Sequence, residues 1–385
     1  MVTIVRSVAW AVISEFASCA MPGPLRQEGD PVGGWQEEAS FCTPLALKRA
    51  RRSVEASCVI EPEPVVGEAT HAFRRLVDNV ELVIAGNTDA VRTAAICLLA
   101  DGNLLLEGVP GVGKTTLARA LARSIGGEFS RIQATPDLLP SDLTGISIYD
   151  QAHAEFRFMP GPVFANVVLV DEINRTTPRT QSALLEPMEE RQVTVEGTTY
   201  PLPTPFVVIA TENPVEQHGT YPLPEGQLDR FAMTVQVGYP QGRTAGDIVR
   251  RQLQGHPLHD LRAVLTPEDV LGGQRAVRQV HVDDAVLEYV VNLVEATRHA
   301  PEVALGASPR STVALTRCAQ ARAVAENREF VLPDDVKAIA PSVLSHRLIP
   351  RQARGGGEVG RQVVGRVLDE VPVPLHATSH TPRRG

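Results

Sequence analysis

The sequence predicts an α/β fold, a parallel sheet flanked by helices, followed by a small all-helical domain. Three short apolar runs, at residues 104–106, 167–170 and 206–210, have the length of buried strands, and helical or hairpin sequence separates them. Strands near residues 128–133 and 234–238 would complete a sheet of five. After Tyr239-Pro240, apolar residues recur at spacings of three and four, which is typical of helices. We therefore expect an α/β domain over residues 66–240 and an all-helical domain over residues 241–350.

The spacing of apolar residues also predicts the individual helices. Residues 66–100 predict two helices, which Gly86-Asn87 separates. The second domain contains three further segments of this kind, at residues 283–298, 309–327 and 333–344. We expect these helices to pack through their apolar faces.

Two segments of the α/β domain are expected to be hairpins. Residues 142–160 end in Glu155-Phe-Arg-Phe-Met159, which alternates as a strand does. Residues 192–200 alternate around Glu196-Gly197, a turn signal between two short strands. Each hairpin either has a mechanical role or is a plain surface element.

Both ends of the chain lack a sustained period. Residues 1–65 mix Pro, Gly and isolated charges, so we expect a disordered N-terminal extension. Its basic run Lys48-Arg-Ala-Arg-Arg52 is interpreted as solvated. Residues 351–385 contain Gly355-Gly-Gly357 and are expected to form a flexible C-terminal tail.

Composition narrows the class of protein. The 385 residues are 43% apolar, which is enough for packed cores, and the net charge of −8 makes nucleic acid an unlikely partner. The five cysteines form no CxxC pair, so neither a zinc ribbon nor a disulfide framework is indicated, and a cytoplasmic location fits best. An N-terminal apolar run resembles a signal peptide, but Ser14 and Glu15 interrupt it. The rest of the sequence contains no stretch of about twenty uncharged apolar residues, so we expect no membrane span.

A phosphate-binding loop follows the first predicted strand. Residues 108–115 match G-x-x-x-x-G-K-[ST] and continue into a good helix over residues 116–123. Glycines let backbone N–H groups close around phosphate oxygens, while Lys114 reaches the β and γ phosphates and Thr115 is a ligand for Mg²⁺. The candidate ATP-binding residues are Gly108, Val109, Pro110, Gly111, Val112, Gly113, Lys114, Thr115 and Thr116.

Two later strands end in residues suited to ATP hydrolysis. Asp171 and Glu172 follow the apolar run at residues 167–170, which places them at the carboxyl edge of the sheet. There Asp171 is a second candidate ligand for Mg²⁺, and Glu172 is a candidate base for the attacking water. Asn213 follows another strand and is a candidate to orient that water. The alternatives are a helix cap for the acidic pair and a turn residue for Asn213.

Several motifs in order resemble the MoxR family of AAA+ ATPases over about residues 70–350. Besides the phosphate loop, they are Asp171-Glu-Ile-Asn-Arg175, Glu186-Pro-Met-Glu-Glu-Arg191, Ala210-Thr-Glu-Asn-Pro214 and Leu223-Pro-Glu-Gly-Gln-Leu-Asp-Arg-Phe231. Pro187 and Gly226 depart from the alanines expected in this family. The resemblance implies a P-loop AAA+ sheet with a helical lid, the hairpins then corresponding to the helix 2 insert and to the hairpin before sensor 1.

The resemblance also implies partners and two further site residues. Relatives work as rings, commonly of six subunits, and act like chaperones on client proteins, often with von Willebrand factor A domain proteins. Arg230 stands where such proteins carry an arginine finger, which acts on a neighbour's nucleotide. Arg310 resembles the sensor 2 arginine, with its own or the neighbour's nucleotide as target.

Two other functions remain open from the sequence. The same ATPase machinery drives nucleic-acid remodelling in related proteins, although the acidic charge balance of this chain argues against it. A nucleotide-dependent scaffold without appreciable turnover is the other alternative, and the Asp171-Glu172 pair argues against that. Arg230 has its own alternative, a surface salt bridge.

Overall fold

The structure is a computed structural model that describes residues 66–109, 111–213, 220–239, 246, 250, 257–351 and 356–374. The predicted N-terminal extension, over residues 1–65, lies outside the described residues, and so does Pro110 of the phosphate loop. None of the described helices has the length and apolarity that a bilayer crossing requires.

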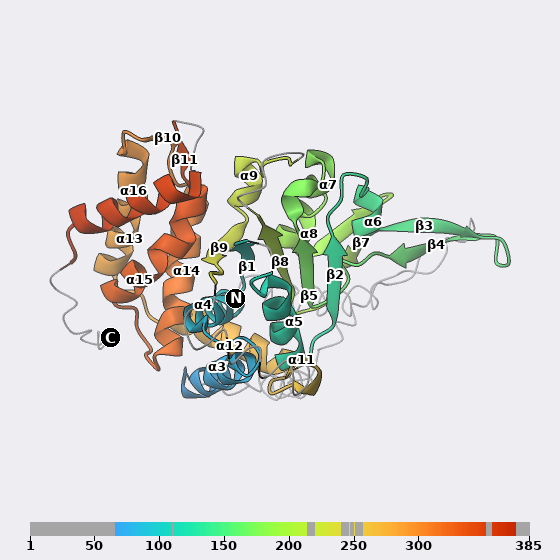
Figure 1. Ribbon diagram of the computed structural model, residues 1–385, viewed down its shortest axis with the longest axis horizontal. Helices are drawn as coiled ribbons and strands as arrows, with labels where there is room; N and C mark the ends of the chain where they lie inside the picture. Colours follow the sequence, from blue (N-terminus) through green and yellow to red (C-terminus); the bar gives the residue numbers. More distant parts are fainter. Residues whose placement is uncertain are drawn as a thin grey trace, which may run out of the picture. The chain divides into compact units, whose positions relative to one another are not determined.

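A five-stranded sheet forms the centre of the α/β domain, and every strand pairing in it is parallel (Figure 1). In spatial order the strands are β2 (Phe129–Gln133), β5 (Val167–Asp171), β8 (Val207–Glu212), β1 (Asn103–Glu107) and β9 (Phe231–Gln236). This confirms all five predicted strands. Because parallel strands point the same way, the carboxyl ends of β1, β5 and β8 lie together at one edge.

The central strands are apolar on both faces because each face is covered. Leu104 and Leu106 of β1 belong to a core that also includes residues of α3 (Val66–Glu81), α4 (Thr88–Leu99) and α5 (Lys114–Ser124). Leu105 points to the other face, into a second core. That second face carries the short helices α6 (Pro140–Thr144), α7 (Pro178–Ser182), α8 (Leu185–Glu190) and α9 (Glu225–Leu228), and the 3-10 turn η1 (Ile173–Arg175).

The second domain is largely helical, as predicted. Its helices are α11 (Pro257–Asp260), α12 (Pro267–Gln279), α13 (Asp284–His299), α14 (Pro309–Ala325) and α15 (Pro333–Leu344), and the 3-10 turn η2 (Ser345–Arg347) follows. The expectation of helices alone needs one correction, because β10 (Val303–Leu305) and β11 (Ile349–Pro350) form a small antiparallel pair. Strands of two or three residues are too short to leave a periodic pattern.

The predicted flexible tail is wrong for residues 356–370, which form α16 (Gly356–Glu370). Val363, Val364 and Val367 of this helix are buried in the core. Glycine serves close packing here, since a Cβ on Gly360 would lie 2.2 Å from the carbonyl oxygen of Ser345. The prediction therefore missed an amphipathic helix, because the start of this segment is rich in glycine.

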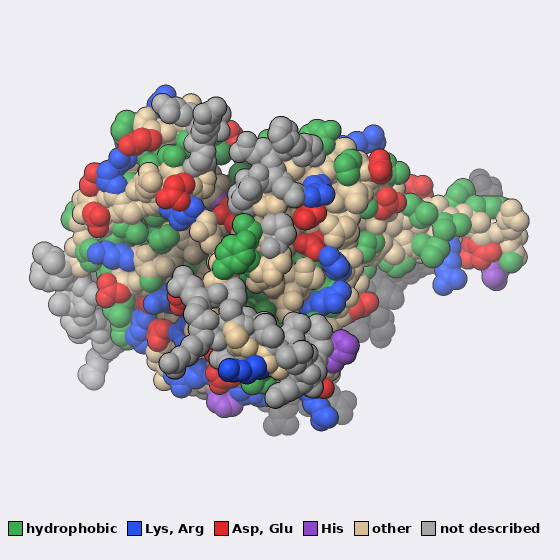
Figure 2. All heavy atoms as spheres, in the orientation of Figure 1, with side chains coloured by type: hydrophobic (Ala, Val, Ile, Leu, Met, Phe, Trp, Pro, Cys, Tyr) green, Lys and Arg blue, Asp and Glu red, His purple; other side chains and the backbone are tan. Residues whose placement is uncertain are grey.

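Both predicted hairpins are present. They are formed by β3 (Gly145–Asp150) with β4 (Glu155–Pro160), and by β6 (Gln192–Val195) with β7 (Thr198–Pro201). The β3–β4 hairpin extends away from the five-stranded sheet in Figure 1. Its apolar side chains cover much of its surface in Figure 2, and five of them are exposed, namely Ile146, Ile148, Tyr149, Phe156 and Met159.

Candidate functional site

The predicted phosphate loop connects the end of β1 to the start of α5. Gly111 has φ +83° and Gly113 has φ +98°, left-handed values that favour glycine. Gly113 is the N-cap of α5, so the N–H groups of the first helical turn, which have no partner within the helix itself, lie at the end of the loop. Their partial positive charge makes this position suitable for phosphate.

The Lys114 ammonium group lies at the junction of the loop and the sheet. This side chain is buried, and its Nζ donates to the carbonyl oxygens of Gly108 at 2.7 Å and Glu212 at 3.0 Å. A buried ammonium needs such partners because losing water without replacement is costly. The lysine is thus held between the loop and the carboxyl end of β8.

Two oxygen ligands that fit Mg²⁺ meet beside the loop. The Thr115 hydroxyl donates to Oδ2 of Asp171 at 3.1 Å. Asp171 also accepts from Thr211 at 2.7 Å and from Arg131 at 2.7 Å. Burial alone would raise the pKa of Asp171, but these three hydrogen bonds outweigh it and lower the pKa. An ionised carboxylate next to a hydroxyl is the donor set a hard divalent cation prefers.

Glu172 is fixed by its backbone and by two side chains. Its φ of 60° is uncommon for a residue other than glycine, and its N–H donates to the Thr211 hydroxyl at 2.8 Å. Its carboxylate accepts from Gln133 at 3.2 Å and pairs with Arg175 at 3.0 Å. Asn213, buried at the end of β8, lies at the same edge. The structure therefore brings Lys114, Thr115, Asp171, Glu172 and Asn213 to one edge of the sheet.

Sequence reasoning missed Glu212 at this edge. Glu212 and Glu107 are register partners at the ends of β8 and β1. Burial, then the charge of Glu107, raises the pKa of Glu212 to about 7, although Lys114 opposes the shift. The available signal was a glutamate within two residues of the end of two predicted strands, Glu107 after residues 104–106 and Glu212 after residues 206–210.

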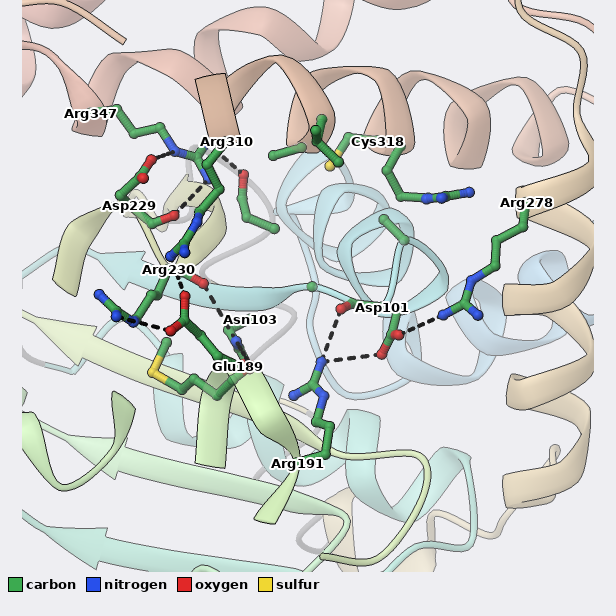
Figure 3. A pocket seen from close by; sticks show the side chains of 17 residues that line it. Asp101, Asn103, Glu189, Arg191, Asp229, Arg230, Arg278, Arg310, Cys318 and Arg347 are labelled. Atoms are coloured by element: carbon green, nitrogen blue, oxygen red, sulfur yellow. Dashed lines mark hydrogen bonds and ion pairs between the residues drawn. The ribbon is translucent and has the colours of Figure 1, made fainter. Parts of the chain in front are cut away.

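Arg230 and Arg310 lie together, away from the phosphate loop of their own chain. Arg230 directly precedes β9, so it is at the amino edge of the sheet, whereas the loop is at the carboxyl edge. A six-residue strand separates the two edges by about 20 Å. Arg230 pairs with Glu189 at 2.9 Å, and Arg310, from α14, pairs with the other oxygen of the same carboxylate (Figure 3).

Asp229 joins the two segments that carry these arginines. It accepts hydrogen bonds from Ser308, the N-cap of α14, at 3.1 and 2.9 Å. It also pairs at 3.1 Å with Arg347, whose side chain is only 2% exposed. Arg347 donates in addition to the backbone carbonyl oxygen of Phe231 at 2.7 Å. The turn before β9 and the start of α14 are thereby held against each other.

Comparisons with known proteins agree with the two-domain fold described above. The family model for the ATPase family associated with various cellular activities matches residues 103–233. The AAA lid domain matches residues 295–367, and so extends into α16. A crystal structure of a candidate ATPase from Cytophaga hutchinsonii superposes with a TM-score of 0.73 at 37% identity, covering 86% of this chain and 99% of the other.

Several of the similar curated proteins carry the name MoxR. The uncharacterized protein YeaC of Bacillus subtilis is 47% identical, over 82% of this chain and 97% of its own. Chaperone MoxR1 of Mycobacterium tuberculosis is 41% identical, over 79% of this chain and 83% of its own. Protein MoxR of Methylorubrum extorquens is 33% identical, over 79% and 95%. With motifs, fold and relatives in agreement, the chain belongs to the MoxR family of AAA+ ATPases.

Proposed function

We propose that the chain hydrolyses ATP in a ring of identical subunits, commonly six in the family, and that the ring remodels or assembles partner proteins. The observation that carries the proposal is the placement of Arg230 and Arg310 on the sheet edge opposite Lys114 and Asp171. In a head-to-tail ring these two edges face each other across every interface. Each site is then completed by the next subunit.

Within one subunit, the loop N–H groups and Lys114 bind the phosphates of ATP. Thr115 and Asp171 hold Mg²⁺, which neutralises charge on the β and γ phosphates when it is bound. Glu172 accepts a proton from water as the water oxygen bonds to the γ phosphorus and the bond to the ADP oxygen breaks. Asn213 orients that water from the end of β8.

The neighbouring subunit contributes positive charge. Arg230 stabilises the charge that develops on the transferred phosphoryl group, an effect of roughly 10³ to 10⁵ in rate for known arginine fingers. Arg310 contacts the same nucleotide from the lid, because the pair it makes with Glu189 places it beside Arg230.

Client proteins are the proposed targets of the ring. Support comes from a relative named as a chaperone and from the β3–β4 hairpin, which exposes five large apolar side chains. Such a surface suits contact with apolar segments of a client. A von Willebrand factor A domain protein is the expected partner, and the cytoplasm is the expected location.

Mixing two inactive variants tests the proposal. Arg230→Ala removes the finger and Glu172→Gln removes the base, so each variant alone should bind ATP and turn over little. In equal mixtures, random head-to-tail assembly should complete roughly one quarter of the sites, since half of the subunits keep Glu172 and half of those meet an intact Arg230. Steady-state ATPase assays with sedimentation measure this.

The control replaces Arg230→Ala with Arg366→Ala, which removes an exposed arginine paired with Glu302 on the lid surface. That variant should stay active alone. Two inactive variants that bind ATP, assemble together and still show no turnover would contradict completion of the site by a neighbour. Wild-type rings that bind ATP without turnover would favour the scaffold function instead.

A further inference from the structure

A cavity of about 410 Å³ lies between the lid and the amino edge of the sheet (Figure 3). Six arginines and three carboxylates line it, an excess of three positive charges in a chain whose net charge is −8. Glu189 with Arg230 and Arg310 forms one end of the cavity. The other end, here called the Asp101 end, contains Asp101, Arg191, Arg278 and Arg317.

A second cavity, of about 300 Å³, meets the first at the Asp101 end. Asp101, Arg191 and Arg278 line both cavities, and the second adds Arg275. Four arginines and one carboxylate therefore line the two cavities where they meet, and their formal charges add up to +3. The proposed ATPase reaction uses none of them.

The single carboxylate is already shared between two arginines. Arg191 donates to Oδ1 of Asp101 at 3.2 Å and to its carbonyl oxygen at 3.0 Å, and Arg278 pairs with Oδ2 at 2.9 Å. The guanidinium carbon of Arg191 also lies over the ring of Phe206, 5.4 Å from its centroid, within the range of a cation–π contact. Its Nη1 is buried and has no hydrogen-bond partner among the described residues.

Arg317 has no carboxylate partner in the described part of the chain. Its Nη1 donates to the amide oxygen of Gln320 at 3.1 Å. Burial, followed by repulsion from Arg278, lowers the pKa of Arg317, with Asp101 opposing the shift. The side chain of Arg278 is 56% exposed, so water screens part of this repulsion, and an anion between the two guanidinium groups would remove the rest.

We propose that the Asp101 end binds an anion of the phosphate class, with Arg278 and Arg317 as its principal donors. Guanidinium groups match phosphate oxygens in pairs of parallel hydrogen bonds. The cavity has room for a chain of phosphates, because Ala100, Gly102 and Ala314 are small side chains in its wall. The phosphates belong either to the neighbour's nucleotide or to a free polyanion.

Binding of tripolyphosphate to the full chain tests the site directly. The protein carries Lys114→Ala to weaken the phosphate loop, and sedimentation selects a concentration at which subunits are separate. We expect saturable binding that weakens at least tenfold when Arg278→Ala and Arg317→Ala are combined. Arg366→Ala, which removes an exposed arginine elsewhere, should change affinity less than twofold.

Asp101→Asn should change the affinity for tripolyphosphate in the opposite direction to the two arginine substitutions. The residue has φ +59°, a conformation that asparagine adopts readily, so the fold should tolerate the change. Asp101 carries the only carboxylate among the described residues that line this end, so its removal should tighten tripolyphosphate binding severalfold. Unfolding cannot produce that gain, and a denaturation curve confirms that the variant is intact. Absence of saturable binding, or unchanged or weaker binding by Asp101→Asn, overturns the proposal.

A final comparison identifies the source of the phosphates. Rings of Glu172→Gln are assembled with ATP and titrated with tripolyphosphate. Loss of binding in the rings indicates that the neighbour's nucleotide fills the site, and retained binding indicates a free polyanion. The titration of separate subunits does not depend on ATP hydrolysis, so it stands even if the proposed function fails.

Discussion

The two edges of the central sheet differ in how the sequence builds them. At the carboxyl edge, each proposed phosphate-site residue lies in or directly after a strand, in the loop that follows β1, or in the first turn of α5 after that loop. At the amino edge, the arginine cavity joins segments near residues 101, 189, 229, 278 and 310, which lie far apart in the sequence and which strand pairing and the packing of the lid bring together. Local sequence therefore specifies one half of the proposed reaction, and tertiary packing specifies the other.

The edges also differ in charge. Acidic side chains and the start of α5 characterise the carboxyl edge, where Glu107, Asp171, Glu172 and Glu212 end their strands or follow them. Arginines dominate the amino edge. Opposite charges on opposite edges favour head-to-tail contacts between identical subunits. Variants at each edge should therefore fail in different ways.

The largest effect is expected at the carboxyl edge, from Glu172→Gln. The variant keeps the shape of the side chain but removes the proton acceptor, so turnover should fall by roughly 10³, about 4 kcal/mol in activation free energy. ATP affinity should change little, because Lys114 and the loop are untouched. Single-turnover hydrolysis and nucleotide binding measure the two quantities. Glu190→Gln, two residues before the β6–β7 hairpin, is the control. An equal loss of turnover in that variant would contradict the assignment of Glu172 as the proton acceptor.

A smaller effect, on stability, is expected at the amino edge from Arg347→Ala. The change leaves Asp229 without its buried partner and frees several backbone carbonyl oxygens. Breaking a buried ion pair costs about 3 kcal/mol. Urea denaturation measures the loss, and Arg351→Ala, at an exposed residue with one backbone hydrogen bond, should cost less than about 0.5 kcal/mol. Equal midpoints for both variants would show that packing alone fixes this edge.

Sequence predicted most of the fold because buried strands appear as short apolar runs, while hairpins and helices leave periodic patterns. The five strands, both hairpins and the helices at residues 66–99 all follow from such patterns. Helix α16 was missed because a glycine-rich start suggested flexibility, although its valines recur at helical spacing. The β10–β11 pair was missed because two short strands carry no period.

Site residues, like elements of the fold, could be predicted only where a local sequence pattern marks them. The motif residues from Gly108 to Thr115, together with Asp171 and Glu172, could be located because each motif is contiguous. Glu189 and Asp229 lie within motifs, but nothing in the sequence indicates that Glu189 contacts two arginines or that Asp229 contacts Arg347. The contact of Glu189 with Arg230 depends on packing within the α/β domain, and the contacts of Arg310 and Arg347 depend on how the lid packs. The partners of Asp101, which precedes β1, depend on both, since Arg191 belongs to the α/β domain and Arg278 to α12.

The smallest effect is expected from Glu212→Gln at the carboxyl edge. The pKa of Glu212 is about 7 in the folded chain against 4.5 as its ordinary value, so the folded chain binds a proton that the unfolded chain releases more readily. Its stabilising contribution is complete below pH 4.5 and is lost as the pH rises to about 7.

Glutamine stays neutral, so Glu212→Gln should be more stable than the wild type at pH 8 by at most about 3 kcal/mol, and nearly equal at pH 4.5. Urea denaturation at both values measures the difference, in which other titrating groups cancel. Glu107→Gln should shift the same transition to lower pH, because it removes the charge that opposes ionisation of Glu212. If the difference in unfolding free energy between Glu212→Gln and the wild type did not depend on pH, Glu107 and Glu212 would not interact. Each acid at this edge would then ionise independently of the others.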